Sequence, residues 1–554
     1  MKKILKWTKR LLLAATIAVG ILFLSLVIYF RSIKVEKPDF AQNFIPSHLR
    51  FQQINDSTRV IGNNYLVRVD SGLYEMYIEG KPFERGENMG ALTSDLHEYQ
   101  EEAFIRQINK MIPNPFYLKF LKYMVTFFNR HIQQFIPPEN LEEIYGESLY
   151  MNSRYDDLIG SPYMRILNYH AAHDIGHALQ DRNFVAGCTS FAAWDRHSED
   201  GKMIVGRNFD FYVGDDFAKN KLVVFMKPDK GIPFAMVSWP GMTGVVSGMN
   251  MQQLTVTINA AKSAYPSEAK TPVSIVARNI LQYASTLDEA IAIARRFDMF
   301  VSESFLVSSG KEGKAVIIEK SPEKTDVFYP DSTLLFCSNH FQSKALKADE
   351  KNVAFMKNSS TVYRFKRLEQ LTAGLHANPS NVAAILRNPY GIDGKKIGWG
   401  NEDALNQFIA HHGVIFKPAS GEMWVSSSPY QVGTLVYFNL NDIFNHRSYG
   451  LNRNKNIAAD TQMVSTIVRP YWEFKSLVDS IKNANKPISD LTIGRMVSLN
   501  PDYYYGYEIA GDYYFALGRK ESASKNYNKS LQCVIPNLLE RKAIEKKLLE
   551  SNKR

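Results

Sequence analysis

The sequence of 554 residues predicts a layered α+β domain, preceded by a membrane segment and followed by a helical extension. Between residue 188 and about residue 445, short β-rich runs such as KLVVFMKP and QLTVTINAA alternate with turns rich in Gly, Pro, Asp and Asn. Two helical stretches, PVSIVARNILQYASTLDEAIAIARRF and TVYRFKRLEQLTAGL, interrupt these runs. Antiparallel hairpin turns with intervening helices are typical of sheets covered by helices, so the fold class is α+β.

The composition is that of a globular protein, with 45% hydrophobic and 12% aromatic residues. The net charge of +10 comes mainly from the two chain ends, and no basic module is interleaved with aromatic residues. This distribution favours a surface near a membrane and argues against a nucleic-acid partner. Three cysteines, Cys188, Cys337 and Cys533, do not make a disulfide framework, although a Cys337–Cys533 bond stays open.

The N-terminus predicts a membrane anchor. The basic stretch MKKILKWTKR precedes 20 uncharged residues, 11–30, which can cross a bilayer core of about 30 Å as a helix. A cleaved signal peptide and a buried core helix are the alternatives, but the flank YFRSIKVEKP lacks a small-residue cleavage site. The basic flank should stay in the cytoplasm, which places residues from about 38 onward in the periplasm or at the cell surface.

The helical parts flank the β-rich region. After a few short strands, residues up to 187 show apolar positions at helical spacing, for example in HEYQEEAFIRQINKMI. From about residue 460 the chain is again helical and basic. There the small and aromatic positions approach the spacing of one tetratricopeptide unit: Gly511, Tyr514, Gly518, Ala523, Tyr527, Ser530 and Pro536. One unit is too short for a solenoid, so this extension is either a helical cap or a site for a protein partner.

Cys188 is the strongest candidate for chemistry. CTSFAAWD and GKMIVGRNFDF flank the turn SEDG, which predicts a β-hairpin that brings Cys188 close to Arg207 and Asp210. A guanidinium favours the thiolate of a neighbouring cysteine and so makes a nucleophile. If Cys188 attacks the carbonyl of Gly187, the chain breaks and Cys188 gains a free α-amino group, which can act as a base near neutral pH. The alternative is a buried, inert cysteine.

GCTSF followed by GRNFDF resembles the N-terminal-nucleophile (Ntn) hydrolases of the choloylglycine hydrolase and penicillin acyltransferase group, peptidase family C45. Further resemblances follow in chain order over residues 70–440. IEGKPFERGENMG is similar to the G-x-P-[FY]-E-R-G-x-x-x-G segment of the acyltransferase branch, and GMNMQQLTVTINAA to the strand that carries an oxyanion-hole asparagine, here Asn259. FCSNHF resembles the strand with a substrate-contacting asparagine, here Asn339, and SSTVYRFKR the helix start with a second active-site arginine, here Arg364.

The resemblance implies a four-layer αββα sandwich and self-cleavage between Gly187 and Cys188. It further implies that Cys188 attacks the acyl carbonyl, Arg207 holds the thiolate and Asp210 positions the new α-amine. Asn259 would stabilise the oxyanion, while Asn339 and Arg364 would orient the amine. The leading segment is longer and more helical than is usual in the family, and the C-terminal helices lie outside its core. These two departures bear on the access of substrate more than on the chemistry.

The chain therefore divides into four parts. Residues 1–37 form a basic stub and anchor, and residues 38–187 a mostly helical leading segment, family-like from about 70. Residues 188–455 form the catalytic core, and residues 456–554 the tetratricopeptide-like extension.

Other polar clusters favour no competing chemistry. His170, His173 and His177 lie on one helical face with Asp174 among them, but the outer pair is about 10 Å apart, too far for one zinc ion. The pair His411–His412 is interpreted as packing or as a wall of the substrate site. The sequence lacks G-x-S-x-G, H-E-x-x-H, the P-loop and G-x-G-x-x-G, so we expect no metal and no cofactor.

The sequence thus predicts an exported, membrane-anchored, self-processing cysteine amidohydrolase or acyltransferase that acts on a small acyl amide. The alternative is a catalytically silent scaffold beside the membrane that binds a protein through its C-terminal helices.

Overall fold

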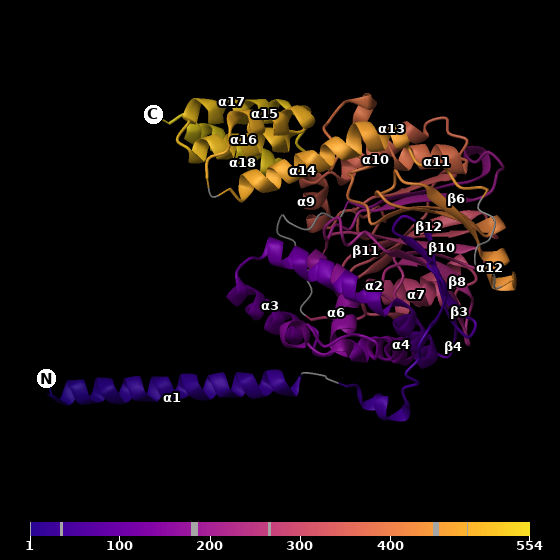
Figure 1. Ribbon diagram of the computed structural model, residues 1–554, viewed down its shortest axis with the longest axis horizontal. Helices are drawn as coiled ribbons and strands as arrows, with labels where there is room; N and C mark the ends of the chain where they lie inside the picture. The colour runs from indigo at the N-terminus through magenta and orange to yellow at the C-terminus, as the bar shows by residue number, and fades with distance from the viewer. Residues whose placement is uncertain are drawn as a thin grey trace.

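The computed structural model describes residues 2–33, 37–178, 187–263, 268–446, 454–484 and 486–553. Helix α1 (Lys2–Ser32) projects from a central body of sheets and helices, and the C-terminal helices gather at one end of that body (Figure 1). Within α1, the stretch Leu12–Phe30 is long and apolar enough to cross a membrane, judged by length and composition.

The larger sheet has eleven strands in the described part of the chain. It is antiparallel except where β4 pairs with β7 in parallel, with Leu73 opposite Lys221. In spatial order its strands are β1 (Gln52–Asn55), β2 (Thr58–Ile61), β3 (Asn64–Asp70), β4 (Leu73–Gly80), β7 (Lys221–Pro228), β8 (Phe234–Ser238), β9 (Ser247–Asn250), β10 (Leu254–Ala260), β11 (Glu303–Ser309), β12 (Lys314–Lys320) and β13 (Thr325–Phe328). The leading segment therefore contributes its first four strands.

The smaller sheet has six described strands, all antiparallel. In spatial order they are β14 (Leu334–Cys337), β5 (Thr189–Ala193), β6 (Ile204–Phe209), β15 (His412–Lys417), β16 (Glu422–Ser426) and β17 (Leu435–Asn439). The hairpin predicted around SEDG is present: β5 pairs with β6, and Ser190 lies opposite Arg207.

Three hydrophobic clusters follow one another through the body. The first lies between the larger sheet and the helices α2 (Pro82–Met111), α4 (Pro138–Ser148), α6 (Pro162–Ala178), α7 (Val273–Tyr283) and α8 (Leu287–Arg296). The second lies between the two sheets, with Phe225 from one and Phe416 from the other. The third lies between the smaller sheet and the helices α10 (Thr361–Thr372) and α11 (Pro379–Leu386). Figure 1 shows these two groups of helices on opposite sides of the sheets. The predicted α+β class is confirmed, and the observed layers are helix, sheet, sheet, helix.

The segment IEGKPFERGENMG joins β4 to α2 and fastens the leading segment to the body. Gly86 lets α2 approach α4, because a Cβ there would lie 2.0 Å from the carbonyl oxygen of Glu143. Arg85 is fully buried and its Nη2 lies 2.8 Å from Oε2 of Glu143. A second buried arginine, Arg278 of α7, lies 3.2 Å from the same carboxylate oxygen. This motif therefore positions helices.

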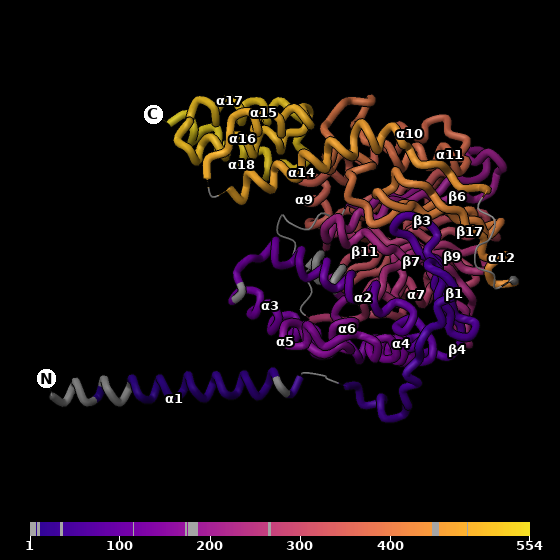
Figure 2. Tube along the Cα trace, in the orientation of Figure 1, coloured from indigo at the N-terminus to yellow at the C-terminus, as the bar shows by residue number. Residues whose placement is uncertain are grey.

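The C-terminal helices pack onto the body and share a core with it. They are α14 (Arg469–Lys482), α15 (Asp490–Leu499), α16 (Tyr504–Ala516), α17 (Lys520–Gln532) and α18 (Leu538–Ser551), and Figure 2 shows α14 between the body and the others. Phe408 and Tyr430 of the body belong to the same hydrophobic cluster as Tyr471 of α14. Gly400, at φ +86°, has no room for a Cβ, which would lie 2.1 Å from Oη of Tyr471. The extension is thus tightly docked.

The remaining helices complete the surface: α3 (Pro115–Phe128), α5 (Asp156–Ile159), α9 (Glu350–Asn358), α12 (Leu440–His446) and α13 (Thr461–Met463).

Candidate active site

Cys188 lies just before β5, and the β5–β6 register brings Arg207 to its side. Nη2 of Arg207 lies 3.7 Å from Sγ of Cys188, and both side chains are buried. Arg207 is held by the larger sheet as well: its Nη1 donates to the carbonyl of Val246 at 2.6 Å, and its Nη2 to the carbonyl of Ile258. Its guanidinium also lies over the ring of Phe209, 4.4 Å from the centroid. The predicted contact between thiol and guanidinium therefore exists.

The protonation of Cys188 differs from the sequence-based expectation. Burial raises the pKa of the thiol above its ordinary value of 9.0, and the charge of Arg207 offsets that rise only in part. Asp210 and Glu303 raise the pKa further, whereas a backbone hydrogen bond at Asp210 lowers it. Arg207 favours the thiolate, as expected, but desolvation dominates in the intact chain.

Asp210 follows β6 and faces the residues around the Gly187–Cys188 bond. Its carbonyl accepts a hydrogen bond from the backbone N–H of Gly187 at 3.3 Å. Burial raises the pKa of its carboxyl from 3.8 to about 7, although Arg364 and Arg207 oppose the shift. Its Oδ1 has no hydrogen-bond partner among the described residues. The carboxylate therefore keeps a free acceptor beside the atoms that self-cleavage would rearrange.

Arg364 and Asn339 lie together next to the backbone of Cys188. Nη1 of Arg364 donates to the carbonyl of Cys188 and to Oγ1 of Thr189, both at 2.8 Å. Its Nη2 donates to Oδ1 of Asn339 at 2.7 Å, and Nδ2 of Asn339 donates to the carbonyl of Ala260 at 3.0 Å. These two residues fix the backbone that carries the thiol.

Asn259 of β10 bridges the two sheets. Its Oδ1 accepts a hydrogen bond from Oγ of Ser190 at 2.8 Å, and its Nδ2 donates to the carbonyl of Cys337 at 3.1 Å. The amide is thus engaged with strands β5 and β14 in the intact chain. An oxyanion role for Asn259 stays a prediction for the reaction with substrate.

Two residues at the site have no counterpart in the sequence analysis. Nε2 of Gln407 donates to the carbonyl oxygen of Gly187 at 3.0 Å and lies 3.5 Å from Oδ2 of Asp210.

Glu303, the first residue of β11, is fully buried, and neither carboxylate oxygen has a hydrogen-bond partner among the described residues. Burial, with the charge of Asp174, raises the pKa of Glu303 well above 4.5 despite Arg207. In the sequence, the one sign of Glu303 is an acidic residue at the start of the strand-like run ESFLVSS. No pattern in the sequence points to Gln407.

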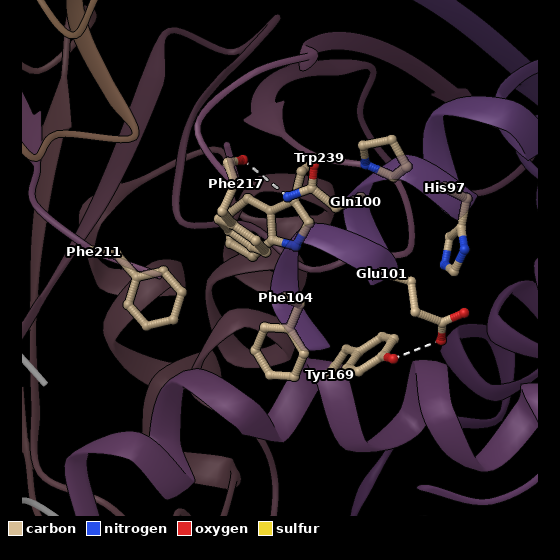
Figure 3. A pocket seen from close by; sticks show the side chains of 9 residues that line it. His97, Gln100, Glu101, Phe104, Tyr169, Phe211, Phe217 and Trp239 are labelled. Atoms are coloured by element: carbon tan, nitrogen blue, oxygen red, sulfur yellow. Dashed lines mark hydrogen bonds between the residues drawn. The ribbon is translucent and has the colours of Figure 1, made fainter. Parts of the chain in front are cut away.

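An aromatic cavity opens near the site between α2, α6 and the loops after β6 and β8. Figure 3 shows its lining, in which Tyr169 donates to Glu101 and Gln100 donates to the carbonyl of Phe217. The lining residues are His97, Gln100, Glu101, Phe104, Tyr169, Phe211, Phe217, Trp239 and Pro240. Stacked rings connect it to the site: Phe211 lies 5.8 Å from Phe209, the ring that Arg207 covers. The free volume of the cavity is about 30 Å³, so in the intact chain it has room for a water-sized group only.

The histidines have packing roles where they are described. Buried His170 contacts the carbonyl of Ile166 and Oγ1 of Thr243, both at 2.9 Å, and burial lowers its pKa to about 4. The side chains of His173 and His177 lie outside the described residues. In the described part of the chain no three His, Cys, Asp or Glu side chains could hold a metal ion.

The pair His411–His412 is buried beside Arg207. Their Nδ1 atoms lie 3.0 Å apart, and Nε2 of His412 contacts Oγ of Ser247 at 2.8 Å. Burial lowers both pKa values well below 6.5, so the rings are neutral and serve as packing near the site. The three cysteines are free, so the Cys337–Cys533 bond that the sequence left open is not formed.

Comparison with known proteins points to one family. Residues 196–426 match the family model described as acyl-coenzyme A:6-aminopenicillanic acid acyl-transferase. The matched segment begins after Cys188 and contains the other five predicted site residues: Arg207, Asp210, Asn259, Asn339 and Arg364.

Two curated relatives are similar over about half of this chain. An uncharacterized protein of Archaeoglobus fulgidus is 27% identical over 285 residues, which is 48% of this chain and 47% of that protein. The N-acylethanolamine-hydrolyzing acid amidase of Caenorhabditis elegans is 25% identical over 275 residues, which is 46% of this chain and 69% of the amidase. The chain thus spans about half the length of the first of these relatives.

Two solved structures each match less than half of this chain. The Caenorhabditis elegans N-acylethanolamine-hydrolyzing acid amidase ortholog gives a TM-score of 0.31 at 17% identity and covers 42% of this chain and 93% of that chain. A variant of the conjugated bile acid hydrolase of Clostridium perfringens gives a TM-score of 0.30 at 14% identity and covers 46% of this chain and 93% of that chain.

Proposed function

We propose that the chain is a self-processing cysteine amidohydrolase or acyltransferase of the penicillin acyltransferase-like group of Ntn hydrolases, whose family model matches residues 196–426. Amide hydrolysis and acyl transfer are the activities of this family. The observation that carries the proposal is the contact between Cys188 and Arg207, next to a carboxylate of Asp210 that keeps one oxygen free.

Self-cleavage begins with attack by Sγ of Cys188 on the carbonyl carbon of Gly187. The C–N bond between Gly187 and Cys188 then breaks, and the α-nitrogen of Cys188 takes up the proton that the thiol loses. Water hydrolyses the resulting thioester, which frees the thiol and leaves a carboxylate at residue 187. The free oxygen of Asp210 supports this course, because it can accept a hydrogen bond from the new ammonium group.

The processed enzyme repeats the same chemistry on a substrate. Sγ attacks the acyl carbonyl of an amide, and the departing amine takes a proton from the α-amino group of Cys188. The acyl thioester then passes its acyl group to water or to a second amine. The name of the Caenorhabditis elegans amidase supports an N-acyl amide as the substrate class.

The location and the C-terminal helices belong to the same proposal. The apolar stretch Leu12–Phe30 supports an anchor with the catalytic body outside the cytoplasm. Gly511 packs so closely against Tyr527 that a Cβ would lie 2.5 Å from its ring, which supports a tetratricopeptide-like pair of α16 and α17. The core shared by Tyr471 and Phe408 favours an extension that acts as part of the enzyme over one that serves as a separate scaffold.

Two measurements test the proposal. Denaturing electrophoresis of the wild type should give two fragments, and N-terminal sequencing of the larger should begin Cys-Thr-Ser, whereas Cys188→Ala should stay whole. A panel of N-acyl amides should then be hydrolysed by the wild type and not by Cys188→Ala. A wild-type chain that stays whole and turns over no acyl amide would contradict the proposal and favour the scaffold.

A further inference from the structure

We propose that Gln407 is a catalytic residue of self-cleavage and donates the hydrogen bond that stabilises the oxyanion formed on Gly187. This role rests on the self-cleavage proposed above. In self-cleavage Cys188 attacks the carbonyl of Gly187, and Gln407 would be the hydrogen-bond donor to that carbonyl. The family resemblance implies no donor for it.

The geometry of the side-chain amide suits this role. Nε2 of Gln407 lies 3.0 Å from the carbonyl oxygen of Gly187, within the distance of about 2.7–3.1 Å at which donors stabilise an oxyanion. The same nitrogen lies 3.5 Å from Oδ2 of Asp210, and Oε1 has no partner among the described residues. Both nearby groups are acceptors, so the orientation that directs the NH2 group toward them is the one that forms hydrogen bonds.

Gly187 is the residue that allows this contact. A Cβ at position 187 would lie 2.2 Å from Nε2 and 2.7 Å from Oε1 of Gln407. Any side chain at this position would push the amide away from the carbonyl. Because Gly187 has no side chain, its carbonyl is accessible to Cys188 and the amide of Gln407 can come within hydrogen-bond distance of it.

The other candidate donors are directed elsewhere in the intact chain. Nδ2 of Asn259 donates to the carbonyl of Cys337. Nη1 of Arg364 donates to the carbonyl of Cys188, one peptide beyond the bond that breaks. Among the described side chains, Gln407 is therefore the one that donates a hydrogen bond to the carbonyl of Gly187.

The C-terminal helices hold Gln407 in place through its neighbour. Phe408 has φ +51°, and its ring lies 6.1 Å from the ring of Tyr430 and 5.8 Å from that of Tyr471 in α14. On the other side, Asn406 donates through its backbone N–H to the carbonyl of Asn388 at 2.9 Å. The backbone of Gln407 is thus held between two anchored residues.

During the attack, Sγ bonds to the carbonyl carbon of Gly187 and the π electrons move onto the oxygen, where Gln407 meets the negative charge. When the intermediate collapses, the C–N bond breaks and the α-nitrogen of Cys188 leaves with the proton that the thiol has lost. The donor is already in place before charge develops, which is why it lowers the barrier.

The test compares rates of cleavage in newly synthesised full-length chains. Gln407→Met keeps the approximate size and removes the donor, and we expect cleavage to slow by about 10²–10³-fold. The matched control is Gln431→Met, since Gln431 is also buried but donates to the carbonyl of Leu386, away from the bond that breaks. We expect this control to cleave within a few-fold of wild type.

Gln407→Glu provides a second readout that a purely structural role would not move. A protonated Glu can donate to the oxyanion, whereas an ionised Glu repels it. Its rate relative to wild type should therefore rise as the pH falls, even if Gln407→Met folds poorly. Gln407→Met cleaving as fast as wild type, or Gln407→Glu showing no such pH dependence, would overturn the role. A wild-type chain that never cleaves would instead overturn the proposed function itself.

Discussion

Two buried clusters of charge in this protein are built in opposite ways. In the cluster that joins the leading segment to the body, the carboxylate of Glu143 is shared by Arg85 and Arg278, with oxygen–nitrogen distances of 2.8 and 3.2 Å. In the cluster around Cys188, Arg207 and Arg364 bind mostly backbone carbonyls and uncharged side chains. The acids Asp210 and Glu303 keep oxygens without a hydrogen-bond partner among the described residues.

The pKa values record this difference. Burial alone would raise the pKa of Glu143, but the charges of Arg278 and Arg85 together hold it below its ordinary value. The same burial raises the pKa of Asp210 to about 7, because the two nearby arginines offset it only in part. Glu143 is therefore ionised and serves stability, whereas Asp210 is destabilising when ionised and keeps a free acceptor for chemistry.

The largest effect should come from removing the shared carboxylate. We expect Glu143→Gln to lower the free energy of unfolding by about 5 kcal/mol, since it removes the ion-pair partner of buried Arg278 and leaves Arg85 with only the partly exposed Asp229. Urea unfolding of the uncleaved Cys188→Ala chain measures this. The control is Glu142→Gln, which changes a half-exposed neighbour on the same helix and should leave the midpoint nearly unchanged. If both variants changed the free energy of unfolding only slightly, the cluster around Glu143 would not be a stabilising one, and the contrast with the cluster around Cys188 would be lost.

The second effect should have the opposite sign. Asp210→Asn in the Cys188→Ala chain should raise the free energy of unfolding by up to about 4 kcal/mol at pH 8, because the folded pKa is about three units above 3.8. A raised folded pKa gives stability that is complete below the unfolded pKa and is lost as the pH rises through about 7. The gain should therefore disappear near pH 4. The same substitution in the active chain should slow self-cleavage and turnover.

A loss of stability on Asp210→Asn, or a gain that does not depend on pH, would show that the carboxylate is satisfied after all. In that case the two clusters would be alike, and Asp210 would be a structural acid.

The parts of the site that the sequence could predict are those that local structure brings together. Cys188 and Arg207 lie on one hairpin, and alternation with a turn signal suffices to pair them. Asn339 and Arg364 were placed by resemblance alone. Gln407 reaches Gly187 across 220 positions, because its segment precedes β15, which pairs with β6. An amide in a loop carries no periodic signal, and only the folded chain shows which carbonyl it meets.

The same limit explains the other corrections. The neighbours of Cys188 in sequence indicated a thiolate, but its pKa depends on burial by segments far along the chain. Arg85 was noted as part of a motif without a role, since its partner Glu143 and the second arginine on that carboxylate, Arg278, come from two other helices. The α+β class could be predicted, because it follows from local strand and helix patterns.

The smallest effect should be at the exposed edge of the stabilising cluster. Asp229 lies 3.3 Å from Nη1 of Arg85 and is one-third exposed. We expect Asp229→Asn to lower the free energy of unfolding by less than about 1 kcal/mol, because Arg85 keeps Glu143 and the carbonyl of Gly80, 2.8 Å away. Urea unfolding of the Cys188→Ala chain at low and high salt measures it. The loss should shrink in about 1 M salt, where exposed charges are screened, while that of Glu143→Gln persists. The contrary result is that Asp229→Asn lowers the free energy of unfolding as much as Glu143→Gln does, and equally at low and high salt. That result would mean that the exposed edge of this cluster contributes as much stability as the buried carboxylate that the two arginines share.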